Sequence, residues 1–220
     1  MFRSSFFIAA GAAATLSILS ACSGSDSSTL TASNNGSNGT IVTNLTDAPF
    51  SSDSVKSVDM FVTRVDARVT DTDSAGADHA LTSDSASANG WVTLATPNKS
   101  FNLLSLQNGV TATLGSATIP AGSYSGLRLI IDPGQSSVTL KDGTVLTSTS
   151  SPSVSFPSAA HSGIKIILSQ PVTITAGATT QLLVDFDVNN SFVQRGNTIN
   201  KNGLLFKPTI KATITARPDS

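Results

Sequence analysis

The chain of 220 residues contains no glutamate, one cysteine, one tryptophan, one tyrosine and two histidines. The lack of glutamate excludes a His-Glu-x-x-His zinc site, because that site uses the glutamate as its base. Two histidines are also few for any other zinc site, so we expect no zinc. No Gly-x-Ser-x-Gly segment is present, and the sequence therefore gives no local sign of an activated serine.

Charge is sparse as well. Thirteen Lys and Arg residues against fourteen Asp residues give a formal net charge of −1. A strong positive field is the usual requirement for nucleic-acid binding, and we expect no nucleic-acid partner. The two histidines, His79 and His161, lie in segments rich in Ser and Ala. We expect both to be solvated loop residues, not catalysts.

The amino terminus has the layout of an export signal. Arg3 precedes an apolar stretch, residues 6–19, that is short for a helix spanning a bilayer. The stretch leads into the tetrapeptide LSAC, which ends at Cys22 and resembles the lipobox of bacterial lipoproteins. We therefore expect residues 1–21 to be a lipoprotein signal peptide and Cys22 to carry the lipid. An ordinary secretory signal with a chance cysteine is the alternative.

Lipidation of Cys22 would leave no free thiol in the mature chain, which excludes disulfides, cysteine-ligated zinc and a cysteine nucleophile. Two or three acyl chains anchor a protein almost permanently, since each buried CH₂ contributes about 0.8 kcal/mol. Residues 22–39 are rich in Ser, Asn and Gly, which predicts a flexible tether after the anchor. Ser23 resembles the outer-membrane pattern of Gram-negative lipoproteins. We expect a lipid-anchored envelope protein, on the outer membrane if the host is Gram-negative.

From residue 40 to residue 217, apolar residues alternate at period two between turn residues, which predicts β-strands. One helical turn is expected, at residues 101–106. The pattern indicates one all-β domain, an antiparallel β-sandwich of immunoglobulin/transthyretin-like architecture. Strands are expected near residues 40–46, 55–70, 91–95, 111–117, 124–131, 137–140, 145–149, 164–168, 172–175, 179–188 and 205–215.

Two local features refine the expected strands. The inward-facing set of strand 55–70 changes phase after Val62, which predicts a β-bulge. The tripeptide KDG at residues 141–143 predicts a hairpin between two short strands.

A weak internal repeat is also present. The segment TIPAGSYSGLRLIID (residues 118–132) aligns without gaps on TITAGATTQLLVDFD (residues 173–187). Each contains an Ala-Gly turn, in which Gly122 or Gly177 would supply a positive φ. We interpret the two segments as hairpins of one sandwich that use the same turn chemistry.

Seven short pieces carry a resemblance to a known family. In this order they resemble the domain of unknown function 4382, which occurs in secreted proteins of bacteria and archaea and often in lipoproteins. The resemblance implies an extracytoplasmic β-rich domain, and it supplies no catalytic residues because no activity is established for the family. The pieces are NLTDAP (44–49), GWVTL (90–94), FNLLSLQNG (101–109), IPAGSYSGLRLII (119–131), SGIKIIL (162–168), VDFDVNNS (184–191) and FKPTI (206–210).

Asp185 and Asp187 are the candidates for catalysis. They project from the same face of an expected strand, and a pair of carboxylates could serve a hydrolase. In the repeat, however, Asp187 aligns with Asp132, which begins the turn sequence DPG, and strand-end aspartates commonly cap turns. Asp47, before Ala-Pro, fits the same role. We favour a structural role for these aspartates and expect no enzyme, with a hydrolase using Asp185 and Asp187 as an alternative.

The segment DTDSAGADHALTSD (residues 71–84) is the candidate metal site. Asp71 and Asp73 match the first ligands of an EF-hand loop, and Asp78 follows two residues after its glycine. Position 12 is Thr82, so the bidentate carboxylate of that loop is missing. We expect no cofactor other than a weak calcium ion at Asp71, Asp73 and Asp78. A solvated acidic loop is the alternative.

The calcium hypothesis predicts that calcium at about 1–5 mM raises the melting temperature, since weak extracellular sites have dissociation constants of roughly 10⁻⁴ to 10⁻³ M. The shift, measured by differential scanning fluorimetry, should reverse with EDTA and disappear in Asp73→Ala. Identical melting curves with calcium and with EDTA in both proteins would contradict the hypothesis.

Trp91 and Tyr124 are the candidates for stacking against a sugar. Each begins an apolar strand, which indicates packing in the core or at its rim. We therefore expect a non-enzymatic binding or structural role at the cell envelope. The N-terminal lipid would hold the protein at the membrane, and the ligand would be an unidentified protein or glycan. A carbohydrate-binding or calcium-dependent adhesive module is the first alternative.

Overall fold

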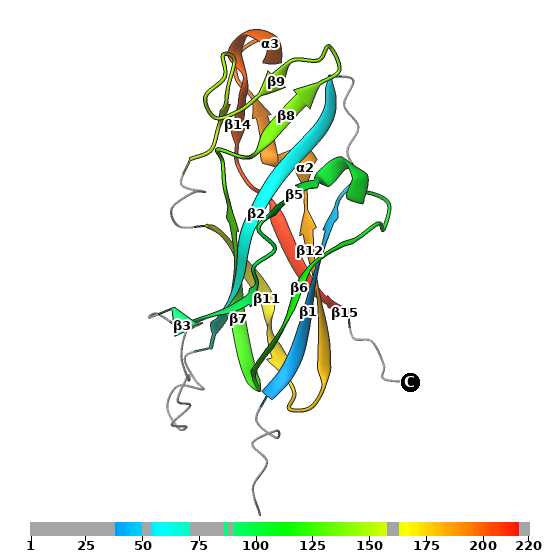
Figure 1. The fold of residues 1–220 in the computed structure, drawn as a ribbon, viewed down its shortest axis with the longest axis vertical. Coiled ribbons are helices and arrows are strands. Elements are labelled where there is room, and N and C mark those ends of the chain that lie inside the picture. The colour runs from blue at the N-terminus through cyan, green and yellow to red at the C-terminus, as the bar shows by residue number, and fades with distance from the viewer. Residues whose placement is uncertain (1–37, 50–53, 71–85, 88–89, 158–162, 216–220) are drawn as a thin grey trace, which may run out of the picture. The chain divides into compact units, whose positions relative to one another are not determined.

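The computed structural model describes residues 38–49, 54–70, 86–87, 90–157 and 163–215, and most of these residues lie in β-strands (Figure 1). The elements in chain order are β1 (Asn38–Asp47), β2 (Val55–Val69), β3 (Ala86–Ser87), β4 (Trp91–Ala95), β5 (Lys99–Asn102), the 3₁₀ helix η3 (Leu103–Leu106), β6 (Ala112–Pro120), β7 (Gly122–Ile131), β8 (Ser137–Leu140), β9 (Val145–Leu146), β10 (Val154–Ser155), β11 (Ile164–Ile174), β12 (Thr179–Phe186), α2 (Val188–Ser191), β13 (Phe192–Gln194), α3 (Ile199–Asn202), β14 (Leu204–Phe206) and β15 (Ile210–Thr215).

The strands of the described ranges form three sheets. Sheet A has the order β15-β12-β1-β6. Sheet B has the order β11-β7-β2-β4-β3, and in addition β5 and β8 pair with β2 while β9 pairs with β8. Sheet C is small, with the order β10-β14-β13. Most neighbours are antiparallel, which confirms the predicted all-β sandwich, but β1 and β12 pair in parallel, as do β10 and β14. These parallel pairs were not predicted from the sequence.

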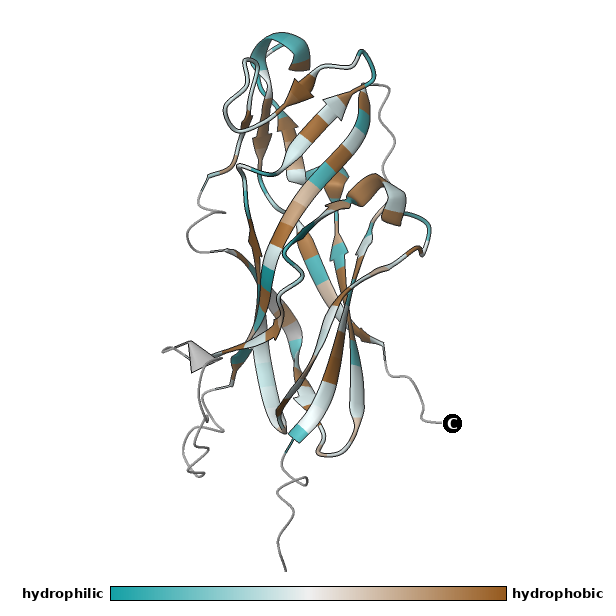
Figure 2. Ribbon diagram, viewed as in Figure 1, coloured by the Kyte–Doolittle hydropathy of each residue, from teal (hydrophilic) through white to brown (hydrophobic). Residues whose placement is uncertain are grey.

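Sheets A and B share one hydrophobic core, to which the buried faces of both contribute. Along β1, Ile41 and Leu45 are buried, and along β12 Leu182 and Val184 are buried beside them. The hydropathy colouring shows this alternation of apolar and polar residues along the long strands (Figure 2). Because side chains alternate across a strand, the residues between these positions are left on the outer faces of the sheets.

The predicted bulge in β2 is confirmed. The register with β7 shifts between Val62 and Arg64, and the buried set changes from Val58, Met60 and Val62 to Val65 and Ala67. The extra residue reverses which positions face outward. As a result Arg64, Asp66 and Arg68 all lie on the outer face of sheet B.

The hairpin interpretation of the internal repeat is wrong. β6 belongs to sheet A and β7 to sheet B, while β11 belongs to sheet B and β12 to sheet A. Each Ala-Gly turn therefore carries the chain from one sheet to the other, so the repeat marks two corners of the sandwich. Gly122 and Gly177 do have positive φ, +156° and +73°, as predicted. The KDG hairpin is confirmed, since β8 and β9 pair in antiparallel fashion around it.

Several strand boundaries differ from the predicted ones. The two strands expected at 164–168 and 172–175 are one strand, β11, with an irregularity in its pairing. The strand expected at 205–215 is broken into β14 and β15, and the strand expected at 179–188 stops at Phe186. The helical turn expected at 101–106 is η3, but α2 and α3 were missed. Both are four residues long, too short for a periodic pattern to reveal.

Candidate functional site

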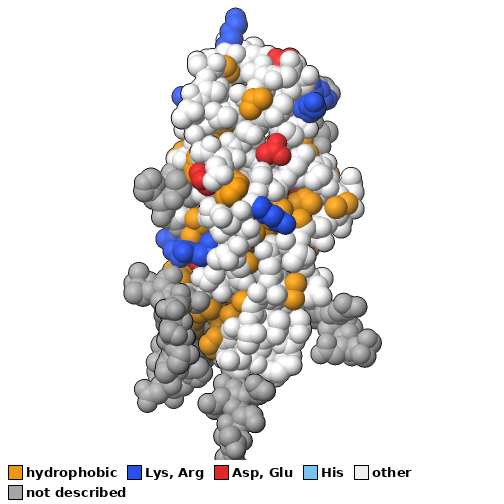
Figure 3. Space-filling model, viewed as in Figure 1, with side chains coloured by type: hydrophobic (Ala, Val, Ile, Leu, Met, Phe, Trp, Pro, Cys, Tyr) orange, Lys and Arg blue, Asp and Glu red, His pale blue; other side chains and the backbone are white. Residues whose placement is uncertain are grey.

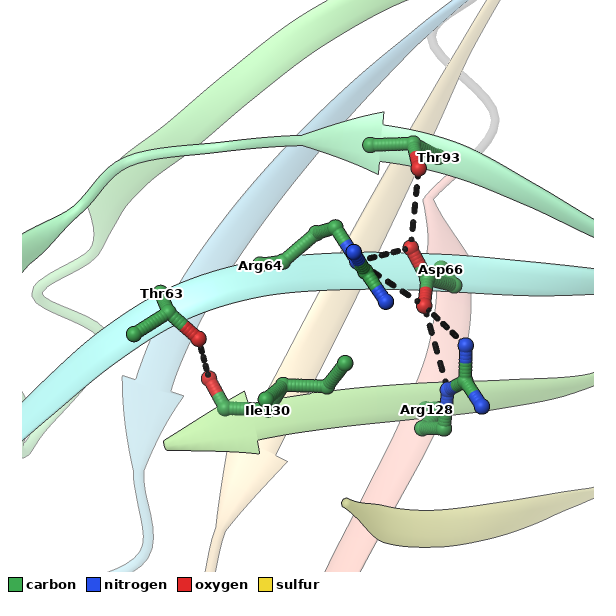
Figure 4. A network of polar contacts seen from close by, with 6 residues as sticks. All are labelled: Thr63, Arg64, Asp66, Thr93, Arg128 and Ile130. Carbon is green, nitrogen blue, oxygen red and sulfur yellow. Dashed lines mark hydrogen bonds and ion pairs between the residues drawn. The ribbon is translucent and has the colours of Figure 1, made fainter. Parts of the chain in front are cut away.

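A polar network crosses three strands on the outer face of sheet B, with Asp66 at its centre (Figure 4). The Asp66 side chain is 0% exposed. Its Oδ1 lies 2.9 Å from Arg64 Nε and accepts a hydrogen bond from Thr93 Oγ1 at 3.0 Å. Its Oδ2 accepts hydrogen bonds from Nε and Nη2 of Arg128, the former at 3.1 Å. Both oxygens of the buried carboxylate are therefore occupied by charged or hydroxyl donors.

The strand register explains why these residues meet. Asp66 of β2 pairs with Thr93 of β4 on one side and with Arg128 of β7 on the other. Directly paired residues point to the same face of a sheet, so the three side chains converge. Arg64 precedes Asp66 by two residues on the same strand and therefore lies on that face too.

Arginine and aromatic side chains extend the network. The guanidinium carbon of Arg128 lies 4.6 Å from the centre of the Trp91 ring, within the range of a cation–π contact. Lys165 of β11 pairs with Arg128 and is exposed. Figure 3 shows one group of Lys and Arg side chains at the left of the view, besides separate ones at the top, at the right and near the centre. The outer face of sheet B thus carries a group of cations, although the sequence contains no run of basic residues that would predict it.

A second polar group lies where β1 and β12 end. Asp47 is 3% exposed and pairs with Phe186, the last residue of β12. Its Oδ1 accepts a hydrogen bond from the Val188 backbone N–H at 3.1 Å, and its Oδ2 accepts one from Gln107 Nε2 at 3.3 Å. The carboxylate thereby joins β1 to α2 and to the segment after η3. Asp47 therefore has a structural role, as expected, but not by capping the turn that follows it, because its partners Val188 and Gln107 lie far away in the sequence.

Burial raises the pKa of Asp47 from 3.8 to about 6, and the negative charges of Asp185 and Asp187 add to the effect, while the two hydrogen bonds oppose it. The protonated form of the Asp47 carboxyl is therefore favoured more in the folded protein than in the unfolded chain. The stability that Asp47 contributes is therefore present in full below about pH 4 and is lost as the pH rises through about 6.

We expect Asp47→Asn to be more stable than the wild type at pH 7 by about 1–2 kcal/mol, and equal to it near pH 4. Asparagine retains the bond from Val188 and, after rotation of the Gln107 amide, can donate to that side chain without a buried charge. Urea denaturation followed by circular dichroism at both pH values measures the difference. Asp132→Asn is the comparison with the opposite sign: hydrogen bonds from Gln135 and Gly134 lower the pKa of Asp132, so this variant should be no more stable than the wild type at pH 7. A lower stability of Asp47→Asn at pH 7 would contradict the prediction.

The paired aspartates of the hydrolase alternative occupy different positions. Asp187 lies beyond the end of β12 and caps α2, where Oδ1 accepts the Asn190 backbone N–H at 3.0 Å and Oδ2 accepts Asn190 Nδ2 at 2.7 Å. Asp185 stays on β12 and pairs with Lys211 of β15. Burial raises the pKa of Asp185, the charge of Asp187 raises it further, and Lys211 opposes the shift.

Other predicted residues are placed as follows. Asp132 caps its turn, with Oδ1 accepting the Gly134 N–H at 2.8 Å, as expected. Tyr124 is buried, and its hydroxyl donates to the Pro120 carbonyl at 2.8 Å, as expected for a core residue. Trp91 is half-buried at the rim. The remaining candidates lie outside the described residues, namely Cys22, Asp71, Asp73, Asp78, His79 and His161.

The Asp66 network was not predicted from the sequence. A signal was present, because Arg64, Asp66 and Arg68 alternate with apolar residues in the segment TRVDARV. Within the ranges that the structure describes, no three Asp or His side chains are grouped so that they could hold a metal ion. No helix in the same ranges is long and apolar enough to cross a bilayer.

Comparison with known proteins gives one result. The family model of a domain of unknown function, DUF4382, matches residues 38–208. No curated protein matches the chain, and no solved structure does. The match runs from the first residue of β1 past the end of β14 and includes the Asp66 network and the Asp47 group. The chain therefore belongs to the family of the domain of unknown function 4382.

Proposed function

We propose that this protein is a lipid-anchored lipoprotein of the cell envelope whose β-sandwich has a non-enzymatic binding role. The observation that carries the proposal is the order of segments at the amino terminus. An export signal ends in LSAC at Cys22, a Ser/Asn/Gly-rich tether follows, and the family match begins at residue 38. A tether of about 17 residues has a root-mean-square length of roughly 20–25 Å. It holds a domain close to a membrane and leaves it free to reorient.

A binding role is supported by what the acidic residues do. Asp47 and Asp187 use their oxygens to join or cap elements of the fold. Asp47 is also too buried to reach a substrate. The solvent-facing side of sheet B, in contrast, presents charged side chains held in defined positions.

Metabolic labelling with tritiated palmitate in a bacterial host tests the anchor. We expect the wild type to incorporate label and Cys22→Ser to incorporate none and to remain an unprocessed precursor. Ser25→Ala, a change in the tether, should label normally and is the matched control. In a Gram-negative host, Ser23→Asp should move the labelled protein from the outer-membrane to the inner-membrane fraction. Equal labelling of Cys22→Ser and the wild type would refute the proposal.

A further inference from the structure

We propose that the outer face of sheet B, around Arg64, Arg128 and Lys165, binds an anionic polysaccharide. The inference rests on the proposed function and deepens it, since it names the class of ligand for the envelope-facing domain. Three features of this face support the proposal, namely its charge, the fixed positions of its arginines and the spread of its cations over neighbouring strands.

The charge comes from three different strands. Arg64 lies on β2, Arg128 on β7 and Lys165 on β11, and Arg128 pairs directly with Lys165 in the sheet register. Asp66 is the carboxylate in direct contact with the two arginines. Arg68 of β2 lies on the same face, so the four cations Arg64, Arg68, Arg128 and Lys165 minus the anion Asp66 leave a local charge of +3 on a chain whose net charge is −1. An anionic ligand is therefore attracted to this face in particular.

The two arginines are held in place before any ligand arrives. Asp66 accepts from Nε of Arg64 and from Nε and Nη2 of Arg128, and Arg128 also lies over the Trp91 ring. A guanidinium has five N–H donors, so Asp66 uses only part of each set. The side chains of Arg64 and Arg128 are 38% and 18% exposed, which leaves part of each group at the surface. Fixed guanidinium groups can bind carboxylates with two parallel hydrogen bonds and lose little side-chain entropy on binding.

The surface suits an extended polymer. The cations are spread across neighbouring strands, which lie about 4.8 Å apart in a sheet. The half-buried Trp91 adds an aromatic edge beside Arg128. A polysaccharide with a carboxylate on each sugar can contact several such cations in succession. Attraction to an anionic bilayer instead relies on clusters of flexible basic side chains, whereas here Arg64 and Arg128 are tied to a buried carboxylate.

The test uses the full-length lipidated protein in a non-ionic detergent, with polygalacturonate as the anionic probe and dextran as the neutral one. We expect biolayer interferometry to show binding to polygalacturonate and none to dextran. The affinity should fall with added salt. The double variant Arg64→Gln/Lys165→Gln should bind polygalacturonate at least about tenfold more weakly. The control is Lys201→Gln/Lys207→Gln, which removes the same charge from exposed lysines outside sheet B.

The double variant keeps the contacts of Asp66 with Arg128 and Thr93, so we expect a melting temperature close to that of the wild type. Absence of polygalacturonate binding by the wild type overturns the inference, as does an equal loss in the control variant. Binding that occurs only to phosphatidylglycerol vesicles also overturns it. If palmitate labelling succeeds while polygalacturonate binding fails, the inference is refuted and the proposed function stands.

Discussion

Asp66→Ala is expected to lower the free energy of unfolding by about 3–5 kcal/mol, because it removes the carboxylate that two arginines share and leaves a hydroxyl without its acceptor. Asp66 is fully buried, and Arg128 is largely covered by the sheet and by Trp91. Without the carboxylate, the Arg128 guanidinium would keep its charge in a partly dehydrated place. Arg64 can turn toward water, since its side chain is 38% exposed, so the loss comes mainly from Arg128 and from the buried position of Asp66 itself.

Urea denaturation of the full chain, followed by circular dichroism, measures the loss. Arg64→Gln provides the matched comparison within the same network and should cost at most about 1 kcal/mol, because Arg64 is 38% exposed and Asp66 keeps its bonds from Arg128 and Thr93. Thr93→Val should lie between the two, since it removes one hydrogen bond to Oδ1. A loss below about 1 kcal/mol for Asp66→Ala would show that the buried carboxylate is not needed for stability.

Phe206→Ala is the second large change, with an expected loss of about 3–5 kcal/mol. Phe206 is 1% exposed and its ring contacts three other phenylalanines. The ring centres of Phe156, Phe186 and Phe192 lie 5.2, 6.0 and 5.1 Å away, respectively. These rings come from sheet A, sheet C and the chain after β10, so the substitution opens a cavity where separate parts of the fold meet.

Thermal and urea unfolding of Phe206→Ala should both show the loss. Phe206→Leu retains most of the buried volume and should lose less, about 1–2 kcal/mol. Val193→Ala on neighbouring β13 is a surface control, because Val193 is 45% exposed, and it should change stability by no more than about 0.5 kcal/mol. If Phe206→Ala and Val193→Ala gave similar stabilities, the aromatic cluster would not be a centre of the fold.

Strand positions were predicted well where burial alternates along a single strand. The expected strands at 91–95 and 137–140 match β4 and β8, and the phase change in strand 55–70 located a real bulge. Alternation is a local signal, since each side chain is sorted between core and solvent by its own polarity. The same signal could not separate β14 from β15 or detect α2, where the chain changes direction within a few residues.

The pairing of strands that lie far apart in the sequence was not predicted. The alignment of segments 118–132 and 173–187 showed equal turn chemistry, yet the turns link sheet A with sheet B. The parallel pairing of β1 with β12 joins residues that lie far apart in the chain. Backbone hydrogen bonds between strands do not depend on residue type. The register of each strand and the sheet to which it belongs therefore depend on how all the strands pack together.

The sequence by itself determined the all-β class, most strand positions and the turn glycines, because each depends on residues close together in the chain. The anchor at Cys22 stays a prediction. Only the tertiary structure decided which charges meet. Arg64, Arg128 and Lys165 are spread over a hundred residues of a sparsely charged sequence that contains no basic run. The register of β2, β7 and β11 brings them to one face around a buried aspartate. Such a group of charges arises from the pairing of strands that are distant in the sequence, so the local composition of the chain does not predict it.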